Sequence, residues 1–179
     1  MSAERKEGGH SPHVQLARAA IEAWVRERRR LDPAEKEDLV RALQERAAAF
    51  VTLKKSGELR GCIGTFQPLQ ETLAEEIISN AISAATRDPR FPPVRPDELH
   101  DLEISVDVLS KPEPVGDVGE LDPRRYGVIV QRGGRIGLLL PDLEGVDSVE
   151  EQLDIARRKA GIGQHEPIQI FRFTVERHH

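Results

Sequence analysis

The sequence predicts an α+β protein in which helices flank a mostly antiparallel β-sheet. Apolar residues recur at helical spacing in some segments and alternate with polar residues in others. The alternating segments come in pairs around turn-forming residues, which is typical of hairpins and therefore of antiparallel pairing. No strand–helix–strand fingerprint of a parallel nucleotide-binding sheet is present. At 179 residues the chain is long enough to bury a real core within one domain.

The N-terminal part predicts a tail followed by two helices. Residues 1–11 are polar and are expected to be disordered, so the folded domain begins at Pro12 together with the first helix. That helix buries one apolar stripe and closes with Arg28-Arg29-Arg30, because cations favour the carbonyl end of a helix. Asp32-Pro33-Ala34-Glu35 is a capping box that opens a second helix, which continues towards Phe50.

Two later segments alternate with the period of a β-strand. Val51 and Leu53 alternate with polar residues, Ser56-Gly57 supplies a turn, and Leu59–Phe66 returns as the second strand of a hairpin. Leu102–Val108 alternates in the same way, and we expect a strand with one face in water.

A third helix is predicted between these strands. It opens at Pro68 and ends near Arg87, because Asp88 precedes a proline and is therefore biased away from the helical conformation. The segment Pro89–Pro96 contains four prolines, so we expect an extended loop.

The C-terminal part predicts a second hairpin and a further helix. The expected elements are, in order, a turn-rich segment over Lys111–Pro123, strands over Tyr126–Gln131 and Arg135–Leu140 around Gly133-Gly134, a helix from the Ser148 capping box to Gly161, and a last strand over Ile168–Val175.

Composition excludes several classes of function. The net charge of −5 and the aromatic content of 4% make nucleic acid an unlikely partner, because they provide neither a general basic field nor many stacking surfaces. A single cysteine excludes an internal disulfide, and with no secretory leader we expect a cytoplasmic protein. No apolar run approaches the roughly 20 residues that span a membrane. No phosphate-binding loop or nucleophile elbow is present, so no cofactor is predicted.

The octapeptide Leu59–Phe66 contains the only cysteine and is the strongest candidate site. In a regular strand Arg60, Cys62 and Gly64 share one face, where a guanidinium favours the thiolate and a glycine leaves room above the sulfur. Cys62 is then an activated nucleophile with Arg60 as its electrostatic partner. The alternative is a small buried hydrophobic residue, the usual state of a free cysteine.

A second candidate is the stiff loop that follows the third helix. Its prolines hold Asp88 and Arg90 at defined positions, and the planar guanidinium of Arg90 suits a carboxylate or phosphate. The alternative is an Asp88–Arg90 ion pair that only fixes the end of the helix. Gly133-Gly134-Arg135 is a weaker candidate, better explained as a hairpin turn.

Histidines and basic runs give no further site. The six histidines show no ligand spacing with Cys62 or with paired carboxylates, so no metal site is predicted. Arg157-Arg158-Lys159 is explained by the dipole at a helix end. His178-His179 is either native or the remainder of a tag.

Four sequence strings together resemble the AMMECR-one family. They are LRGCIGTF at Leu59, DPRFPPV at Asp88, a strand ending in VLSKPEPV, and GLLLP before a short helix. The bacterial and archaeal members of that family are also called AmmeMemoRadiSam system protein A. The resemblance covers about Leu16 to Val175. It departs from the family where Gly145 is followed by Val146, because many members carry a tryptophan there.

The resemblance implies one domain over residues 12–179 with two lobes, a larger one and a smaller one, and a cleft between them near the octapeptide. It implies a modification pathway shared with a Memo-like protein and a radical SAM protein, and it carries no settled reaction, so whether the protein is an enzyme stays open. We interpret Cys62 as nucleophile or covalent acceptor, Arg60 as its charge partner and Arg90 as an anion clamp. The expected site residues are Arg60, Gly61, Cys62, Gly64, Thr65, Asp88 and Arg90. The rival interpretations are a non-catalytic adaptor and an RNA-associated protein of translation.

Overall fold

The computed structural model describes residues 9–179, which form two compact units. The first unit contains the described residues up to Val108 together with Arg177–His179, and the second contains Leu109–Glu176. Each unit has a four-stranded sheet with helices, so the α+β class is confirmed. Of the tail 1–11 that was predicted to be disordered, residues 1–8 lie outside the described residues, and Ser11 is the N-cap of the first helix, with its side chain accepting from the N–H of Val14.

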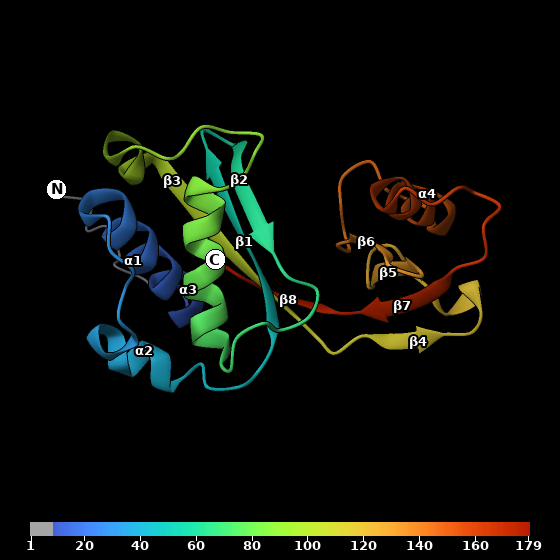
Figure 1. Ribbon diagram of the computed structural model, residues 1–179, viewed down its shortest axis with the longest axis horizontal. Helices are drawn as coiled ribbons and strands as arrows, with labels where there is room; N and C mark the ends of the chain where they lie inside the picture. The colour runs from blue at the N-terminus through green and yellow to red at the C-terminus, as the bar shows by residue number, and fades with distance from the viewer. Residues whose placement is uncertain (1–8) are drawn as a thin grey trace, which may run out of the picture. The chain divides into compact units, whose positions relative to one another are not determined.

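The sheet of the first unit, here called the first sheet, has the strand order β2-β1-β3-β8 (Figure 1). Its strands are β1 (Ala48–Lys55), β2 (Glu58–Gly64), β3 (Leu102–Leu109) and β8 (Val175–His178). The predicted hairpin is confirmed: β1 and β2 pair antiparallel around Ser56 and Gly57, whose φ angles of 52° and 78° suit a tight turn between twisted strands.

The helices of the first unit cover one face of its sheet. They are α1 (Pro12–Glu27), α2 (Glu37–Arg41) and α3 (Leu73–Thr86), with 3-10 turns η1 (Pro33–Lys36) and η2 (Pro96–Asp101). Figure 1 shows α3, in green, along β1 and β2, and α1 packs on α3. The core between these layers is aliphatic; its largest fully buried side chains include Leu16, Ile21, Leu43, Leu53, Leu73, Ile77, Ile78 and Leu99.

The predicted second helix is wrong in its extent. The capping box of Asp32 and Glu35 forms, but the helix ends at Arg41 and β1 already begins at Ala48. The carbonyl groups of Leu43 and Glu45 instead accept hydrogen bonds from the first N–H groups of α3. The first N–H groups of any α-helix have no partner within that helix, and these bonds supply partners for α3. If the second helix continued towards Phe50, these bonds would be lost.

The third helix also begins later than predicted. Thr72, and not Pro68, is its N-cap, because the Thr72 side chain accepts a hydrogen bond from the N–H of Glu75 at 3.2 Å. The predicted end is confirmed, since Arg87 is the C-cap. The loop that follows turns at Pro89 and Arg90 before running extended to η2.

The second unit has the strand order β4-β7-β5-β6. Its elements are β4 (Glu113–Val115), η3 (Val118–Glu120), β5 (Gly127–Arg132), β6 (Arg135–Leu139), α4 (Val149–Ala160) and β7 (Gln169–Phe173). The predicted second hairpin and the helix from Ser148 to Gly161 are confirmed, and Gly161 ends α4 with a φ of 69°. α4 packs on β5 and β6, and a small aliphatic core lies between them.

Two strand predictions in this part were incomplete. The turn-rich segment contains the short strand β4, which pairs antiparallel with β7. The predicted last strand is two strands, β7 and β8, interrupted at Thr174. The carbonyl of Thr174 accepts a hydrogen bond from the N–H of Ser110, and the N–H of Thr174 donates to the hydroxyl oxygen of Ser110. The two strands therefore join different sheets.

Candidate functional site

Cys62 lies on the face of the first sheet opposite to the helices. Val51 and Leu53 of β1 are fully buried in the core, so the side chain of Thr52 between them points to the other face. Cys62 is the register partner of Thr52, and its sulfur lies 3.2 Å from Thr52 Oγ1. The side chain of Cys62 is half-buried. We call this surface, which bears Thr52 and Cys62, the Cys62 face.

The loop after α3 closes the outer edge of β2 at Cys62. β2 is an edge strand, and the N–H of Cys62 donates to Asp88 Oδ2 at 3.0 Å. Arg90 completes the arrangement: its Nε and Nη2 donate to the two carboxylate oxygens of Asp88 at 3.0 and 2.8 Å, and Nη2 also reaches the Cys62 carbonyl at 3.5 Å. The unpaired backbone N–H and C=O groups of an exposed edge strand can pair with another chain, and a loop over the edge prevents this. The predicted Asp88–Arg90 pair is therefore formed beside the thiol.

The surroundings of Cys62 favour the neutral form of its thiol. Burial raises the pKa of the Cys62 thiol, and the negative charges of Asp107 and Asp88 raise it further, against the hydrogen bond from Thr52 and the charge of Arg90. Hydrogen bonds from Arg90 hold the pKa of Asp88 well below its usual range, so that carboxylate stays charged. The direction of this shift in the thiol pKa is opposite to the expected activation.

Arg60 is engaged elsewhere, contrary to the expected pairing with Cys62. Leu53 pairs with Gly61 while Lys54 pairs with Leu59, so Arg60 is the extra residue of a β-bulge. Its Nε and Nη2 donate to both carboxylate oxygens of Glu98, each at 3.1 Å. These bonds lower the pKa of Glu98 to about 2. The simple alternation that placed Arg60 beside the sulfur fails because a bulge redirects one side chain.

Thr65 is also bound to a buried carboxylate. Its hydroxyl donates to Glu76 Oε1 at 2.6 Å, and Glu76 is 1% exposed. The other oxygen of Glu76 accepts from the backbone N–H groups of Leu69 and Gln70 at 3.0 and 2.8 Å. Thr65 therefore anchors the loop after β2 onto α3 through its hydrogen bond to Glu76.

The two glycines of the octapeptide are required by close packing. A Cβ on Gly61 would lie 2.2 Å from the backbone oxygen of Ala84, so α3 approaches β2 closely only because this position has no side chain. A Cβ on Gly64 would lie 2.2 Å from Cγ of Phe50. The expected open space above Gly64 is thus filled by the Phe50 ring.

The remaining sequence candidates have structural roles. Arg135 donates to the carbonyl of Gly161 at 2.8 Å and to Glu166 at 2.9 Å, as expected for a residue that fixes a hairpin. Arg157 donates to the carbonyl groups of Gly163 and Glu166. Over residues 9–179 no group of three or more His, Cys, Asp or Glu side chains could hold a metal ion, and no helix there is long and apolar enough to cross a membrane.

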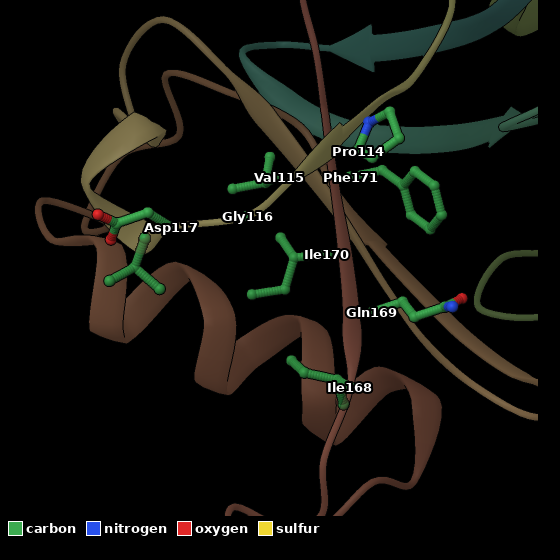
Figure 2. A pocket seen from close by; sticks show the side chains of 9 residues that line it. Pro114, Val115, Gly116, Asp117, Ile168, Gln169, Ile170 and Phe171 are labelled. Atoms are coloured by element: carbon green, nitrogen blue, oxygen red, sulfur yellow. The ribbon is translucent and has the colours of Figure 1, made fainter.

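The second unit contains a pocket of about 470 Å³ beside β4 and β7. Figure 2 shows Val115, Ile168 and Ile170 pointing to the same side of β7. Asp117 also lines the pocket, but its carboxylate accepts from the N–H of Gly119 and caps η3. The wall is therefore mainly aliphatic, and it offers no side chain suited to acid–base or nucleophilic chemistry.

Several residues that shape the Cys62 face were missed by sequence reasoning. Thr52 is the side-chain neighbour of the sulfur, and only the register of the hairpin reveals it. Asp107 of β3 influences the thiol and is bound by Arg177 of β8 at 2.7 Å. The alternation of β3 already placed Asp107 on the wet face, but nothing in the sequence showed that β3 neighbours β1 or that Arg177 follows beside it.

Comparisons with known proteins agree with this fold. The family model described as AMMECR1 matches residues 14–178. A protein of Thermotoga maritima is 57% identical over 174 residues, covering 95% of this chain and 98% of that protein. A longer protein of Clostridium acetobutylicum is 48% identical and contains the match in 37% of its length. The crystal structure of the uncharacterized protein PH0010 from Pyrococcus horikoshii superposes with a TM-score of 0.84 at 35% identity, covering 92% of this chain and 88% of that one.

The chain belongs to the AMMECR1 family, as the resemblance predicted. The names of these relatives state no activity, so membership establishes family and fold. Function is therefore argued from the arrangement of residues on the Cys62 face. The expected cleft between two lobes stays a prediction.

Proposed function

We propose that the protein binds an anionic substrate on the Cys62 face and presents it to the enzymes of a shared modification pathway. The observation that carries this proposal is the placement of Arg90. A nearly fully buried carboxylate, that of Asp88, holds the guanidinium of Arg90 beside Cys62, while the Arg90 side chain is 57% exposed. An arginine fixed in this way binds an anion at a lower entropic cost than a mobile one.

The state of the thiol favours binding over nucleophilic attack. Attack requires a thiolate, and burial keeps Cys62 protonated at neutral pH. A protonated thiol still contacts a ligand. If a partner supplies a base that takes the thiol proton, the sulfur can form a bond to the electrophilic atom of an activated donor, whose leaving group departs with the electron pair of the bond that breaks. Cys62 is then a contact residue or covalent acceptor, Arg90 binds the substrate, and Asp88 holds Arg90 in position.

The proposed partners come from the family resemblance alone. The family resemblance implies a Memo-like protein and a radical SAM protein, and a binding component that lacks an activated group of its own suits such a pathway. The rival adaptor interpretation predicts the same complexes but no requirement for Cys62 or Arg90. The RNA interpretation depends on the basic runs Arg28–Arg30 and Arg157–Lys159. It is not favoured, because Arg29 is bound to Glu35 and Arg157 to the carbonyl groups of Gly163 and Glu166.

The test is capture from extracts of the organism that encodes the protein. Full-length protein, its C62A and R90Q variants and the control R41Q are used as bait, and bound proteins and metabolites are identified by mass spectrometry. Arg41 is a suitable control, because it forms an exposed pair with Glu37 on α2. We expect a Memo-like or radical SAM protein with the unchanged chain and R41Q, and its loss with C62A and R90Q. Equal recovery with all four baits, or recovery of neither partner, contradicts the proposal.

A further inference from the structure

The pocket of the second unit lies where β4 stops following β7. Val115, the last residue of β4, pairs with Ile170, and directly after it the chain leaves the strand. On the other side the extended segment continues past Ile170 to Gln169 and Ile168. The pocket of about 470 Å³ is lined by these two diverging segments. It therefore occupies a position beside β7 that the next residues of β4 would fill if that strand were longer.

The backbone groups of Ile168 face this pocket. Residues along an antiparallel strand direct their N–H and C=O groups alternately to the two neighbouring strands. Pro114 has no N–H to exchange with its register partner Phe171, so the backbone groups of Phe171 face β5 and those of Ile170 face β4. Figure 2 shows Ile168 and Ile170 on one side of β7 and Gln169 and Phe171 on the other, so the alternation continues to Ile168. The N–H and C=O of Ile168 therefore point to the side where β4 has ended.

The structure provides no backbone partner for these two groups. Within residues 9–179 neither the N–H nor the C=O of Ile168 forms a backbone hydrogen bond. On the opposite wall, the N–H groups of Gly116 and Asp117 already donate to Glu120 Oε2 at 3.1 and 3.3 Å. An unpaired donor and acceptor on one strand residue can pair with an extended peptide that adds to the sheet. A ligand residue opposite Ile168 would exchange both hydrogen bonds with it.

The side-chain surface of the pocket suits an aliphatic group. Val115, Ile168 and Ile170 point to the same side of β7, and Val118 of η3 completes the wall. The first three are half-buried, and Val118 is 53% exposed. An aliphatic side chain placed there removes apolar surface of both partners from water. In an antiparallel pair the side chain opposite Ile168 lies on this same face, so the hydrogen bonds and the apolar contact fit one ligand residue.

The charge beside the pocket favours a basic ligand. Asp117 lines the pocket, and the carboxylate of Glu120 lies against the backbone of Gly116 and Asp117. Within residues 9–179 neither carboxylate forms a salt bridge with a basic side chain. Arg172 reaches the carbonyl of Glu120, but its guanidinium is paired with the carboxylate of Glu113 at 3.4 Å. Two acidic groups therefore stay without a compensating cation next to the apolar wall.

We propose that the second unit binds an extended peptide segment of a partner protein by strand addition to β7. One aliphatic residue of the segment pairs with the backbone of Ile168 and inserts its side chain into the pocket. Lysine or arginine residues two positions from it lie towards Asp117 and Glu120. This inference goes beyond the proposed function, because none of these residues belongs to the Cys62 face.

Hydrogen exchange of the full-length protein tests the premise. In the free protein, the amide of Ile168 should exchange with water much faster than that of Ile170, whose N–H faces β4. Slow exchange of Ile168 in the absence of any ligand would show that its N–H already has a partner, and the proposal would then be wrong.

Four short peptides test the recognition by NMR titration. The probe is Ac-KTITK-NH2, which carries lysine two positions on either side of a central isoleucine. The references replace isoleucine by alanine, by N-methyl-isoleucine, or both lysines by glutamate. We expect the probe to slow exchange of the Ile168 amide about 10-fold or more at saturation. The alanine and N-methyl peptides should each bind about 10-fold more weakly, since one loses the apolar contact and the other a hydrogen bond.

A charge-neutral variant tests the acidic groups without removing their hydrogen bonds. In D117N/E120Q both side chains keep an accepting oxygen, and asparagine caps a helix as well as aspartate does. We expect this variant to lose the preference for the lysine peptide over the glutamate peptide and to keep the protection of Ile168. The control E71Q/D97N removes two exposed charges of the first unit and should retain the preference.

Two outcomes would overturn the strand-addition site. One is a probe that shifts the methyl signals of Val118 and Ile168 but leaves exchange of the Ile168 amide unchanged, because the pocket would then bind an aliphatic group without strand pairing. The other is equal affinity for the probe and its N-methyl reference. Neither result affects the proposed function, which depends on capture by the Cys62 face.

Discussion

The carboxylate of Asp88 accepts a hydrogen bond from the backbone N–H of Cys62 at 3.0 Å, and so joins the loop after α3 to the edge of β2. The same carboxylate orients Arg90. The buried carboxylate of Asp88 therefore binds the edge of β2 and also fixes the exposed guanidinium of Arg90 beside the thiol. This relationship explains why the octapeptide and the loop lie together although 26 positions separate the bonded residues.

Replacing Asp88 by asparagine should lower stability and release Arg90. An amide has one accepting oxygen, so it cannot serve the Cys62 N–H and the Arg90 guanidinium as the carboxylate does. We expect a loss of about 3 kcal/mol in the free energy of unfolding, as is typical when one member of a buried pair is removed. Urea denaturation measures the change. D97N is the control, and an equally small change in both variants would show that Asp88 is not the anchor.

The alkylation of Cys62 should report a raised pKa. Because the neutral thiol does not react, the rate with iodoacetamide should rise with pH and give an apparent pKa above the ordinary value of about 8.5. T52V should slow the reaction further, since Thr52 lowers the pKa of the thiol by hydrogen bonding, and T52S should restore the rate. An apparent pKa below the ordinary value would instead support the activated nucleophile.

Glu98 should make stability depend on acid pH. The pKa of Glu98 is lowered to about 2 in the folded protein, mainly by hydrogen bonds from Arg60, against 4.5 for the unperturbed group. The folded state therefore binds this proton less readily than the unfolded chain. The resulting stability is fully present above the unfolded value and is lost as the pH falls from about 4.5 towards 2.

E98Q should flatten the stability profile in that pH interval. It should also destabilise the protein at neutral pH, because Arg60 would keep a buried charge without its carboxylate. Thermal unfolding of both proteins from pH 2 to pH 7 checks this expectation. Parallel profiles for E98Q and the unchanged protein would mean that Glu98 is not the responsible group.

Gly61→Ala should be strongly destabilising. The new methyl group would lie 2.2 Å from the Ala84 backbone oxygen, so α3 would have to move off β2 at a cost of about 3 kcal/mol. Gly116→Ala is the matched control, because its Cβ would meet nothing within 4 Å. Urea midpoints compare the two variants. Equal midpoints would show that the helix does not require this close approach.

Local signals in the sequence predicted most of the architecture. Capping residues such as Ser148, the turn at Ser56-Gly57 and the alternation of β3 depend on neighbours in the chain, so they can be read without the fold. The second helix was extended too far because small apolar residues such as Ala49 suit both helical and strand periods. Only the hydrogen bonds to the start of α3 decide between them.

The candidate site could be predicted only in part. Cys62, Asp88 and Arg90 are brought together as the sequence suggested. Arg60 was misplaced because a bulge breaks the alternation, and its partner Glu98 is 38 positions away. Such pairings depend on which elements meet in three dimensions, and that information is absent from local spacing.

The most direct test of the central claim, that Cys62 lies on an accessible binding surface, is its alkylation in the native protein. We predict that labelling proceeds without unfolding, at a rate that is constant with urea well below the unfolding transition, and that it slows when the captured partner is bound. Labelling that occurs only through global unfolding, with no protection by the captured partner, would contradict the account.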